Sequence, residues 1–203
     1  MPFHDPPRFP IGFHCASRHI GLKPDAKDLA LFVSEVDAPA AAMFTRNQFP
    51  GAPVILGRET MKGGRLRGIV VNSKISNVAT GELGLQNARR MAAAAAAEFE
   101  CSEDRFLVSS TGVIGVALPI EVIEMGLHGM AEELQDDPLV GAEGIMTTDT
   151  YAKALSLSVG DHLEIGDDGE LGFIGALTYR NAYQRSENLL SDQVLFVNTD
   201  GIN

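Results

Sequence analysis

The sequence predicts a protein of the α/β class, with strands and helices arranged in layers. Two observations lead to this expectation. Short apolar runs with strand character alternate with segments rich in helix-forming residues, and no internal repeat or low-complexity linker separates them. The 203 residues are 45% hydrophobic and 21% charged, a composition ordinary for a globular protein that buries a core. That length suits one large domain or two small ones.

The first elements are an arm, two strands and a short helix. Residues 1–12 are predicted to be extended, because proline lacks a backbone donor and restricts its neighbours. Apolar runs predict strands at 28–36 and 40–47, with a turn at the Asp37-Ala-Pro segment between them. Residues 52–64 are ambiguous but favour a short helix, which Gly63-Gly64 would close.

The middle of the chain shows the strongest signals. The run LRGIVVNS at 66–73 predicts a strand, and residues 82–99, dense in alanine and other helix formers, predict a helix. A strand is expected at 105–109. Pro119 suits the first turn of a following helix. Apolar residues at steps of three and four give that helix one buried stripe: Ile120, Ile123, Leu127, Met130 and Leu134.

The last third contains weaker signals. Asp137-Pro138 is typical of the cap and first turn of a short helix. Alternation predicts a strand at 153–160, and Asp168-Gly169 between apolar flanks indicates a hairpin. Residues 178–190 favour a helix, and 193–198 favour a final strand.

Charge and composition exclude several functions. The net charge of -11 argues against nonspecific binding to nucleic acid or anionic membranes. Cys15 and Cys101 make no disulfide framework, so a reduced, cytoplasmic protein is expected. The N-terminus lacks the apolar core of a signal peptide, and the longest apolar run, 91–97, is too short to span a bilayer. No metal site is predicted, because the histidines lack ligand spacing: His4, His14, His19, His128 and His162.

Polar clusters follow apolar elements at three places: residues 70–84, 108–115 and 145–153. Taken singly, each is explained by turn chemistry, since Asn, Ser, Thr and Gly satisfy local backbone groups. Taken together, they predict a shared cleft, because loops at the ends of strands carry sites.

The Ser-Thr-Gly segment of the second cluster can assist acyl chemistry. No nucleophile beside a base, nucleophile elbow or phosphate-binding loop is present. The backbone N–H of Gly112 can approach a ligand without a Cβ in the way, and the Thr111 hydroxyl can donate a second hydrogen bond. Two such donors form an oxyanion hole, each worth ~3 kcal/mol. That chemistry serves acyl transfer or amide cleavage.

Six blocks in order resemble the ornithine acetyltransferase family, also called the bifunctional glutamate N-acetyltransferases. The blocks are DLALFVSE, AAAMFTRNQFPGAPV, GRLRGIVVNS, NVATGELGLQNA, VSSTGVIGVALP and IMTTDTYAK. The match extends from about Ile11 to Leu157. The resemblance implies a layered mixed sheet with helices, like the N-terminal portion of that fold, over residues 13–160. The arm would precede it, and residues 161–203 would form a divergent hairpin, helix and strand.

The resemblance also implies roles in arginine biosynthesis. Family members cut themselves before a threonine, which becomes the N-terminal nucleophile of a β chain. Thr111 and Gly112 would be the oxyanion-hole pair, Thr147 would bind substrate, and Asn72 and Thr80-Gly81 would support the cleft. The ligand would be N-acetylornithine or glutamate, with no cofactor and no metal. A β chain or self-association is expected, and no nucleic acid or membrane partner.

Departures from the family pattern concern the nucleophile. No Gly-rich KGSGM loop, matching lysine or Ala-Thr cleavage site follows the IMTTDTYAK block, and Lys74-Ile-Ser replaces small residues in the first cluster. The chain is therefore expected to be inactive alone. Three explanations stay open: an α chain whose partner carries the nucleophile, an internally shortened relative, or a non-catalytic binding or assembly protein. A subunit of an N-terminal-nucleophile amidohydrolase is a further alternative.

Overall fold

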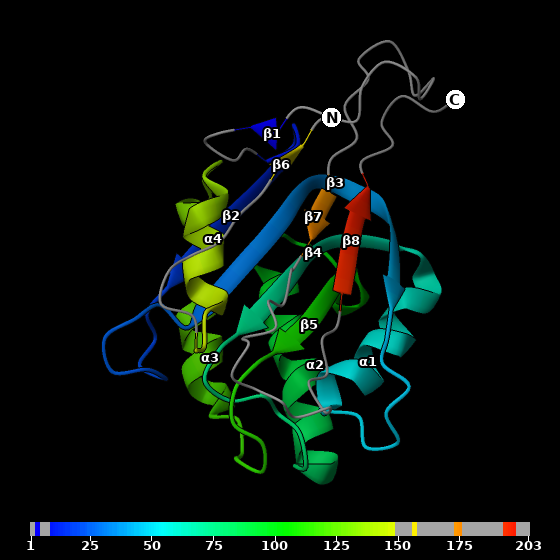
Figure 1. Cartoon of the computed structure of the whole chain (residues 1–203), viewed down its shortest axis with the longest axis vertical. Helices are drawn as coiled ribbons and strands as arrows, with labels where there is room; N and C mark the ends of the chain where they lie inside the picture. Colours follow the sequence, from blue (N-terminus) through cyan, green and yellow to red (C-terminus); the bar gives the residue numbers. More distant parts are fainter. Residues whose placement is uncertain (1–2, 5–8, 149–155, 158–172, 176–192, 198–203) are drawn as a thin grey trace.

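The computed structural model describes residues 3–4, 9–148, 156–157, 173–175 and 193–197, and it is built around a mixed sheet (Figure 1). The strands of this sheet are β2 (Phe13–Arg18), β3 (Leu29–Met43), β4 (Arg65–Asn72), β5 (Phe106–Ser110), β7 (Phe173–Gly175) and β8 (Gln193–Val197). Their order is β5-β4-β3-β8-β7, and β2 pairs with the first half of β3. Strands β4 and β5 are parallel, whereas the other pairs are antiparallel. A separate antiparallel pair joins β1 (Phe3–His4) to β6 (Ser156–Leu157).

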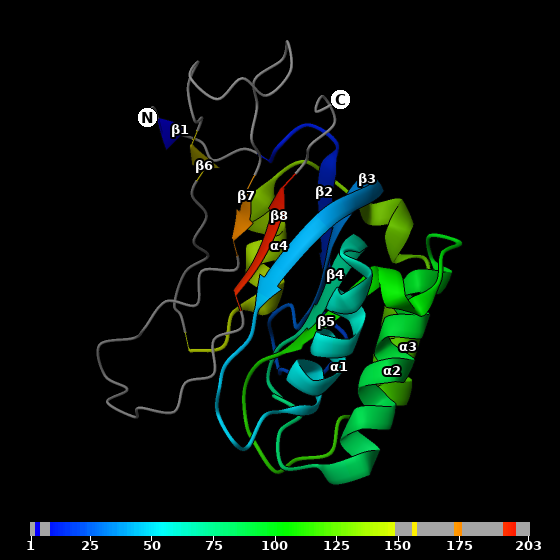
Figure 2. The same ribbon diagram turned by 90° about the vertical axis from the view of Figure 1, so that its right-hand side faces the viewer.

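Helices cover both faces of this sheet, which confirms the predicted α/β class. The helices are α1 (Ala52–Thr60), α2 (Gly81–Ala97), α3 (Ile120–Leu127) and α4 (Pro138–Ile145), with 3-10 turns η1 (Met61–Gly63), η2 (Glu103–Arg105) and η3 (Met130–Glu133). Figure 2 shows α2 and α3 on one side of the sheet, whereas α4 packs on β2, β3 and β4. Among these described segments, no helix has the length and hydropathy needed to cross a bilayer.

Alternate residues of the central strands enter two separate cores. In β3, Leu29 and Leu31 pack toward α2 and α3, whereas Ala30 and Phe32 pack toward the α4 side. Successive side chains of a strand point to opposite faces, so a strand covered on both faces is apolar without interruption. Gly141 of α4 lies directly on the ring of Phe32, where a Cβ would overlap with it. This close approach brings the end of α4 near the sheet.

The turn predicted at Asp37 is wrong. Residues 29–43 form one strand, whose register on β4 shifts between Val33 and Ala38, so that residues 34–37 lie opposite Arg67 alone. This irregularity bends β3 and lets its first half pair with β2 and its second half with β8. The carboxylate of Asp37 contacts Arg105 Nε at 3.1 Å, and its carbonyl accepts a hydrogen bond from Arg65. These tertiary contacts hold the bend within the strand.

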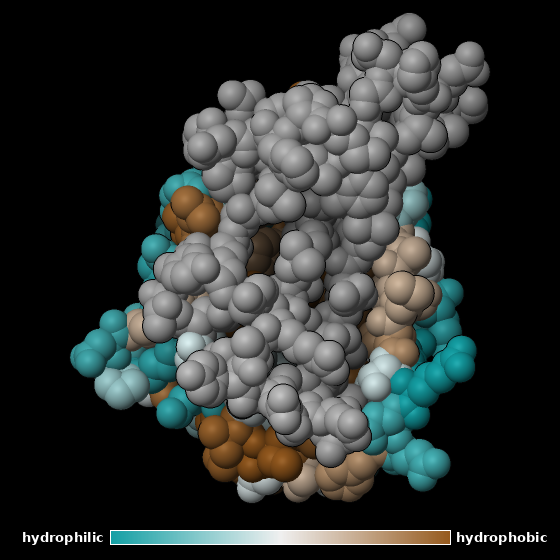
Figure 3. Space-filling view, viewed as in Figure 1, coloured by the Kyte–Doolittle hydropathy of each residue, from teal (hydrophilic) through white to brown (hydrophobic). Residues whose placement is uncertain are grey.

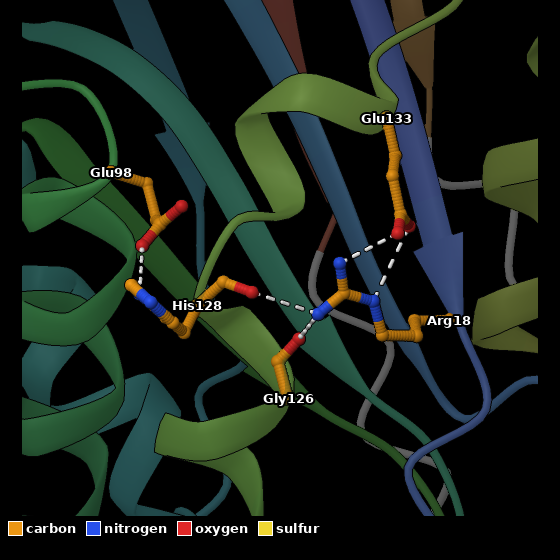
Figure 4. Close-up of polar contacts among 5 residues, drawn as sticks. All are labelled: Arg18, Glu98, Gly126, His128 and Glu133. Carbon is orange, nitrogen blue, oxygen red and sulfur yellow. Dashed lines mark hydrogen bonds and ion pairs between the residues drawn. The ribbon is translucent and has the colours of Figure 1, made fainter.

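The single helix predicted from Pro119 to Leu134 is interrupted. Pro119 precedes the first turn of α3, the helix ends at Leu127, and Gly129 then adopts a left-handed φ of 71°. Arg18 of β2 donates to the carbonyls of Gly126 and His128 at 2.8 and 2.9 Å, and it pairs with Glu133 (Figure 4). The cation satisfies carbonyls that a helix end leaves without partners. The apolar stripe nevertheless continues inward, since Met130 is fully buried in η3.

Most of the remaining described elements agree with the predictions, whereas strand β2 (Phe13–Arg18) lies where the sequence predicts no element. Helices α1 and α2 and strands β4, β5 and β8 occupy the predicted ranges within a few residues, and Gly64 closes η1 with a φ of 63°. Asp137 caps α4 by accepting the N–H of Leu139 at 2.9 Å. Several predictions lie outside the described residues: the Asp168-Gly169 hairpin, the helix at 178–190, half of the arm and most of the strand at 153–160. The domain boundaries stay predictions.

Candidate functional site

The first two polar clusters meet where β4 and β5 end. The strands are parallel neighbours, with Asn72 opposite Ser110, so their carboxyl ends emerge at the same edge of the sheet. The Thr111 N–H donates to the Asn72 carbonyl at 3.0 Å, and the Ser110 hydroxyl donates to Asn72 Oδ1 at 2.6 Å. The side chain of Asn72 is fully buried and donates from Nδ2 to the Ile75 carbonyl at 2.8 Å. Asn72 therefore ties the two strand ends together, in line with the supporting role expected for it.

The loops beyond the strands continue side by side. The Val113 N–H donates to the Lys74 carbonyl at 2.9 Å, and the Val113 carbonyl accepts the Ser76 N–H at 2.9 Å. Further along, the Gly115 N–H donates to the Val78 carbonyl at 2.8 Å. The loop that contains Thr111 and Gly112 is thus held against the loop that follows β4.

Gly112 occupies a position that only glycine can fill. Its φ is 135°, and a Cβ would overlap with the carbonyl of Lys74 and lie 2.7 Å from the Ile75 nitrogen. Gly112 is exposed and Thr111 half-buried. Within the part of the chain that the structure describes, neither the Gly112 N–H nor the Thr111 hydroxyl makes a hydrogen bond. Both predicted donors are available to a ligand, although their convergence on one atom stays a prediction.

The third cluster reaches the same edge through α4. The buried Ser73 hydroxyl donates to the Gly144 carbonyl at 2.7 Å, and a Cβ on Gly144 would lie 2.8 Å from the Leu29 carbonyl oxygen. The Lys23 ammonium donates to the carbonyl of Met146 just beyond the helix. Thr147, the next residue, is exposed. The structure therefore brings Thr147 to the edge where β4 and β5 end.

Residues that the sequence analysis did not single out organise this edge. The buried Asp28 carboxylate accepts the N–H groups of Ile20 and Lys23 at 2.7 and 2.8 Å. Its backbone carbonyl accepts the Ser73 N–H at 2.8 Å. Burial lowers the pKa of Lys23, and the positive charge of Lys74 lowers it further, against the opposing effect of Asp28. Residues 19–28 carry no sequence motif, so only their contacts show this role.

The start of α2 supplies the other expected support. The Thr80 hydroxyl donates to Asn77 Oδ1 at 2.8 Å, and Asn77 Nδ2 donates to the Gly84 carbonyl at 2.9 Å. Asn77 is fully buried, and Gly81 begins the helix with a φ of 60°. The spacing of Asn77 three residues before Thr80-Gly81, at the start of the predicted helix, is the signal that could have identified it from the sequence.

An exposed apolar surface adjoins the two donors. Three residues of the loop after Gly112 are exposed: Val113, Ile114 and Val116. Figure 3 shows apolar atoms gathered at the lower edge of the view, where Figure 1 places the loop after β5. Leu83, in the first turn of α2, is also exposed. Contiguous exposed apolar groups are typical of surfaces that another chain covers.

The chemistry available at this edge is hydrogen-bond donation and positive charge. No described hydroxyl at this edge is bonded to a histidine, lysine or carboxylate side chain, so the described residues of the edge do not assemble a nucleophile with its base. In the same described ranges, no three His, Cys, Asp or Glu side chains gather to hold a metal ion. A hollow of about 150 Å³ lies at the opposite end of β5, between α1, α2 and η2, where Arg89 pairs with Glu59 at 2.7 Å.

The family model and the curated relatives that match this chain indicate the same family. The ArgJ family model matches residues 14–171, which extends past Leu157. The arginine biosynthesis bifunctional protein ArgJ of Thermotoga neapolitana is 45% identical over 152 residues, covering 74% of this chain and 38% of that protein. ArgJ 2 of Clostridium acetobutylicum is 40% identical over 158 residues, covering 77% and 41%. The chain thus spans about two fifths of the length of the curated relatives it matches.

Two solved structures share the fold. The arginine biosynthesis bifunctional protein of Bacillus halodurans aligns with a TM-score of 0.69 and 34% identity, covering 73% of this chain and 80% of that chain. The ornithine acetyltransferase of Mycobacterium tuberculosis, solved in complex with ornithine, aligns with a TM-score of 0.68 and 29% identity. That alignment covers 80% of this chain and 96% of the other.

Proposed function

Because this chain belongs to the ArgJ family, we propose that it is the α-chain-like part of a cytoplasmic acetyltransferase that moves an acetyl group from N-acetylornithine to glutamate. Its contribution is the oxyanion hole and part of the substrate pocket. The observation that carries this proposal is the pair of donors at Thr111 and Gly112, which have no partner among the described residues. They lie on the edge where three polar loops meet.

The proposed reaction has two acyl-transfer steps. A nucleophile from a partner segment attacks the acetyl carbonyl carbon of N-acetylornithine, and the carbonyl oxygen becomes an oxyanion. The Gly112 N–H and the Thr111 hydroxyl donate to that oxygen, and each donor is worth ~3 kcal/mol at this stage. The C–N bond then breaks, and the ornithine amine leaves with a proton. The glutamate amine then attacks the carbonyl carbon of the acetylated nucleophile and forms a second oxyanion, to which the same two groups donate. The bond between the acetyl carbon and the nucleophile breaks, and the nucleophile recovers the proton that the glutamate amine loses. Thr147 binds the polar end of the substrate.

Two observations support the need for a partner: the length of the chain relative to its relatives, and the exposed apolar residues beside the two donors. The chain spans about two fifths of its curated relatives, whereas the alignment covers 96% of the solved Mycobacterium tuberculosis chain and 80% of this one, so that solved chain is no longer than this one. The exposed apolar loop residues Val113 and Ile114 adjoin the donors, where a second chain would bury them. Both observations favour a site completed by a β chain.

The test compares the chain alone with a chain completed by a relative. The purified chain, given N-acetylornithine and glutamate, should form no N-acetylglutamate by mass spectrometry. A chimera in which residues 14–171 replace the matching part of the Thermotoga neapolitana relative should form it. In that chimera Thr111→Ala should lower kcat about 10²–10³-fold, and Thr111→Ser should restore it.

The same assay separates the alternatives. Turnover by the lone chain would refute the requirement for a partner, and a folded but inactive chimera would refute the acetyltransferase role. Release of acetate and ornithine without glutamate, at the rate of transfer, would favour an amidohydrolase.

A further inference from the structure

Lys74 adopts a backbone conformation that disfavours lysine. It is the second residue after β4 and has a φ of 86°, in the left-handed region. Residues with a Cβ pay about 1–2 kcal/mol there, which glycine would avoid. Contacts on both sides impose the conformation, because Ser73 is bonded to Gly144 and the Lys74 carbonyl accepts the Val113 N–H. Backbone strain of this kind is retained where the side chain has a function.

The ammonium group of Lys74 has no anionic partner among the residues that the structure describes. The side chain is exposed and makes neither a hydrogen bond nor an ion pair with any residue that the structure describes. This is notable in a chain with 27 acidic and 16 basic residues, where Lys27, Arg18 and other cations are paired. The group is therefore free to bind an anion from solution.

The position of Lys74 places its charge at the candidate site. Its backbone lies against Gly112, so the lysine borders the proposed oxyanion hole directly. Its charge also acts on Lys23, whose ammonium binds the Met146 carbonyl beside Thr147. The backbone of Lys74 therefore lies beside Gly112, and its charge is near enough to Lys23, at the end of α4, for the two ammonium groups to repel each other.

We propose that Lys74 binds a carboxylate of the amino-acid substrate and thereby makes the site prefer acids over their amides. This inference rests on the proposed function, because it takes the ligand to be an amino-acid derivative held between Gly112 and Thr147. A cation beside an N–H and a hydroxyl donor is the arrangement that a carboxylate requires. A glycine at position 74 would avoid the strained φ but would leave no charge beside Gly112.

The experiment measures binding and stability of the purified full chain. N-acetyl-L-ornithine and its α-carboxamide are titrated calorimetrically against the wild type, Lys74→Ala, Lys74→Gly and Lys74→Arg. The wild type should bind the acid about tenfold tighter than the amide. The variants Lys74→Ala and Lys74→Gly should lose this preference, whereas Lys74→Arg should retain it because it keeps the positive charge. Lys74→Gly should also raise the Tm by about 2–4 °C, because it relieves the backbone strain.

Two control variants isolate the effect. Glu100→Gly relieves a φ of 51° at an exposed residue beyond the C-terminal end of α2, so it should raise stability without changing binding. Lys62→Ala removes one exposed charge near the start of β4, at the opposite end of that strand, and should leave the preference intact.

The outcomes separate this inference from the proposed function. If the wild type binds acid and amide equally, or if Lys62→Ala removes the preference as Lys74→Ala does, the role of Lys74 is overturned while the acetyltransferase proposal stands. If the wild type binds neither ligand, and the chimera with the Thermotoga neapolitana relative is also inactive, the proposed function fails and this inference fails with it.

Discussion

Gly112 lies so close to the backbone of Lys74 that a Cβ on Gly112 would overlap with the Lys74 carbonyl. The same Gly112 has a φ of 135°, which residues with a side chain rarely adopt. Two independent constraints, dihedral and steric, therefore select glycine between the strand end and the loop after β4.

Gly112→Ala should destabilise the protein and separate the two loops. Dihedral strain alone costs about 1–3 kcal/mol, and relief of the overlap requires the loop to move away from Lys74. Gly115→Ala is the matched control, since Gly115 has a φ of 75° but open space where the Cβ would be. Urea denaturation should show a larger loss for Gly112→Ala than for Gly115→Ala, and equal losses would contradict the close approach.

Ser73→Ala should weaken the connection between β4 and α4. The Ser73 hydroxyl is buried, and its loss leaves the Gly144 carbonyl without that donor, which costs about 1–3 kcal/mol. The exposed Ser102 provides the comparison, because Ser102→Ala should change the free energy of unfolding by less than about 0.5 kcal/mol. Urea denaturation measures the free energy of unfolding of each variant. If Ser73→Ala leaves this free energy unchanged, the hydrogen bond does not hold α4 against the sheet.

His14 should make stability depend on pH. Partial burial lowers the pKa of His14, but hydrogen bonds to Glu35 and Asp136, and their negative charges, outweigh it and raise the pKa overall. The ring nitrogens lie 2.9 Å from Glu35 Oε1 and 2.5 Å from Asp136 Oδ1. A raised pKa means that the stabilisation is complete below the unfolded value of about 6.5 and is lost as pH rises through the folded value.

Free energies of unfolding measured from pH 5.5 to 8.5 test the predicted pH dependence that His14 confers. Because Glu35 and Asp136 are exposed, the loss with rising pH should be at most about 1 kcal/mol, and His14→Asn should remove it. The quantity of interest is the difference between the free energies of unfolding of the wild type and the variant at each pH, since every other titratable group is the same in both. Parallel pH profiles for the two proteins would exclude His14 as the source.

Local sequence signals were sufficient where an element depends on its own residues. The alanine-rich helix α2 forms because its residues favour helix, and α4 begins at Pro138 because Asp137 caps it. Strands β4 and β5 are continuous apolar runs, as strands covered on both faces must be. The three polar clusters were also visible in the sequence, since each follows an apolar element.

Local signals failed where distant residues decide the backbone. Asp37 has turn character, but its carboxylate contacts Arg105 and its carbonyl contacts Arg65, so the chain stays in one bent strand. The stripe from Ile120 to Leu134 has helical spacing, but Arg18 binds the carbonyls of Gly126 and His128 where the helix ends. In both cases the partner lies many residues away along the chain, outside any local window.

The sequence by itself determined the α/β class, most element positions in the described residues, the family and the polar clusters, because these depend on local composition and on the order of blocks. Only the tertiary structure decided that the clusters share one edge, since this follows from the parallel pairing of β4 with β5 and from the contact of Ser73 with Gly144. It also decided the left-handed backbone conformation of Lys74, which has no ion-pair partner in the described ranges. Such features arise from packing between segments that are far apart in sequence, which no local pattern encodes.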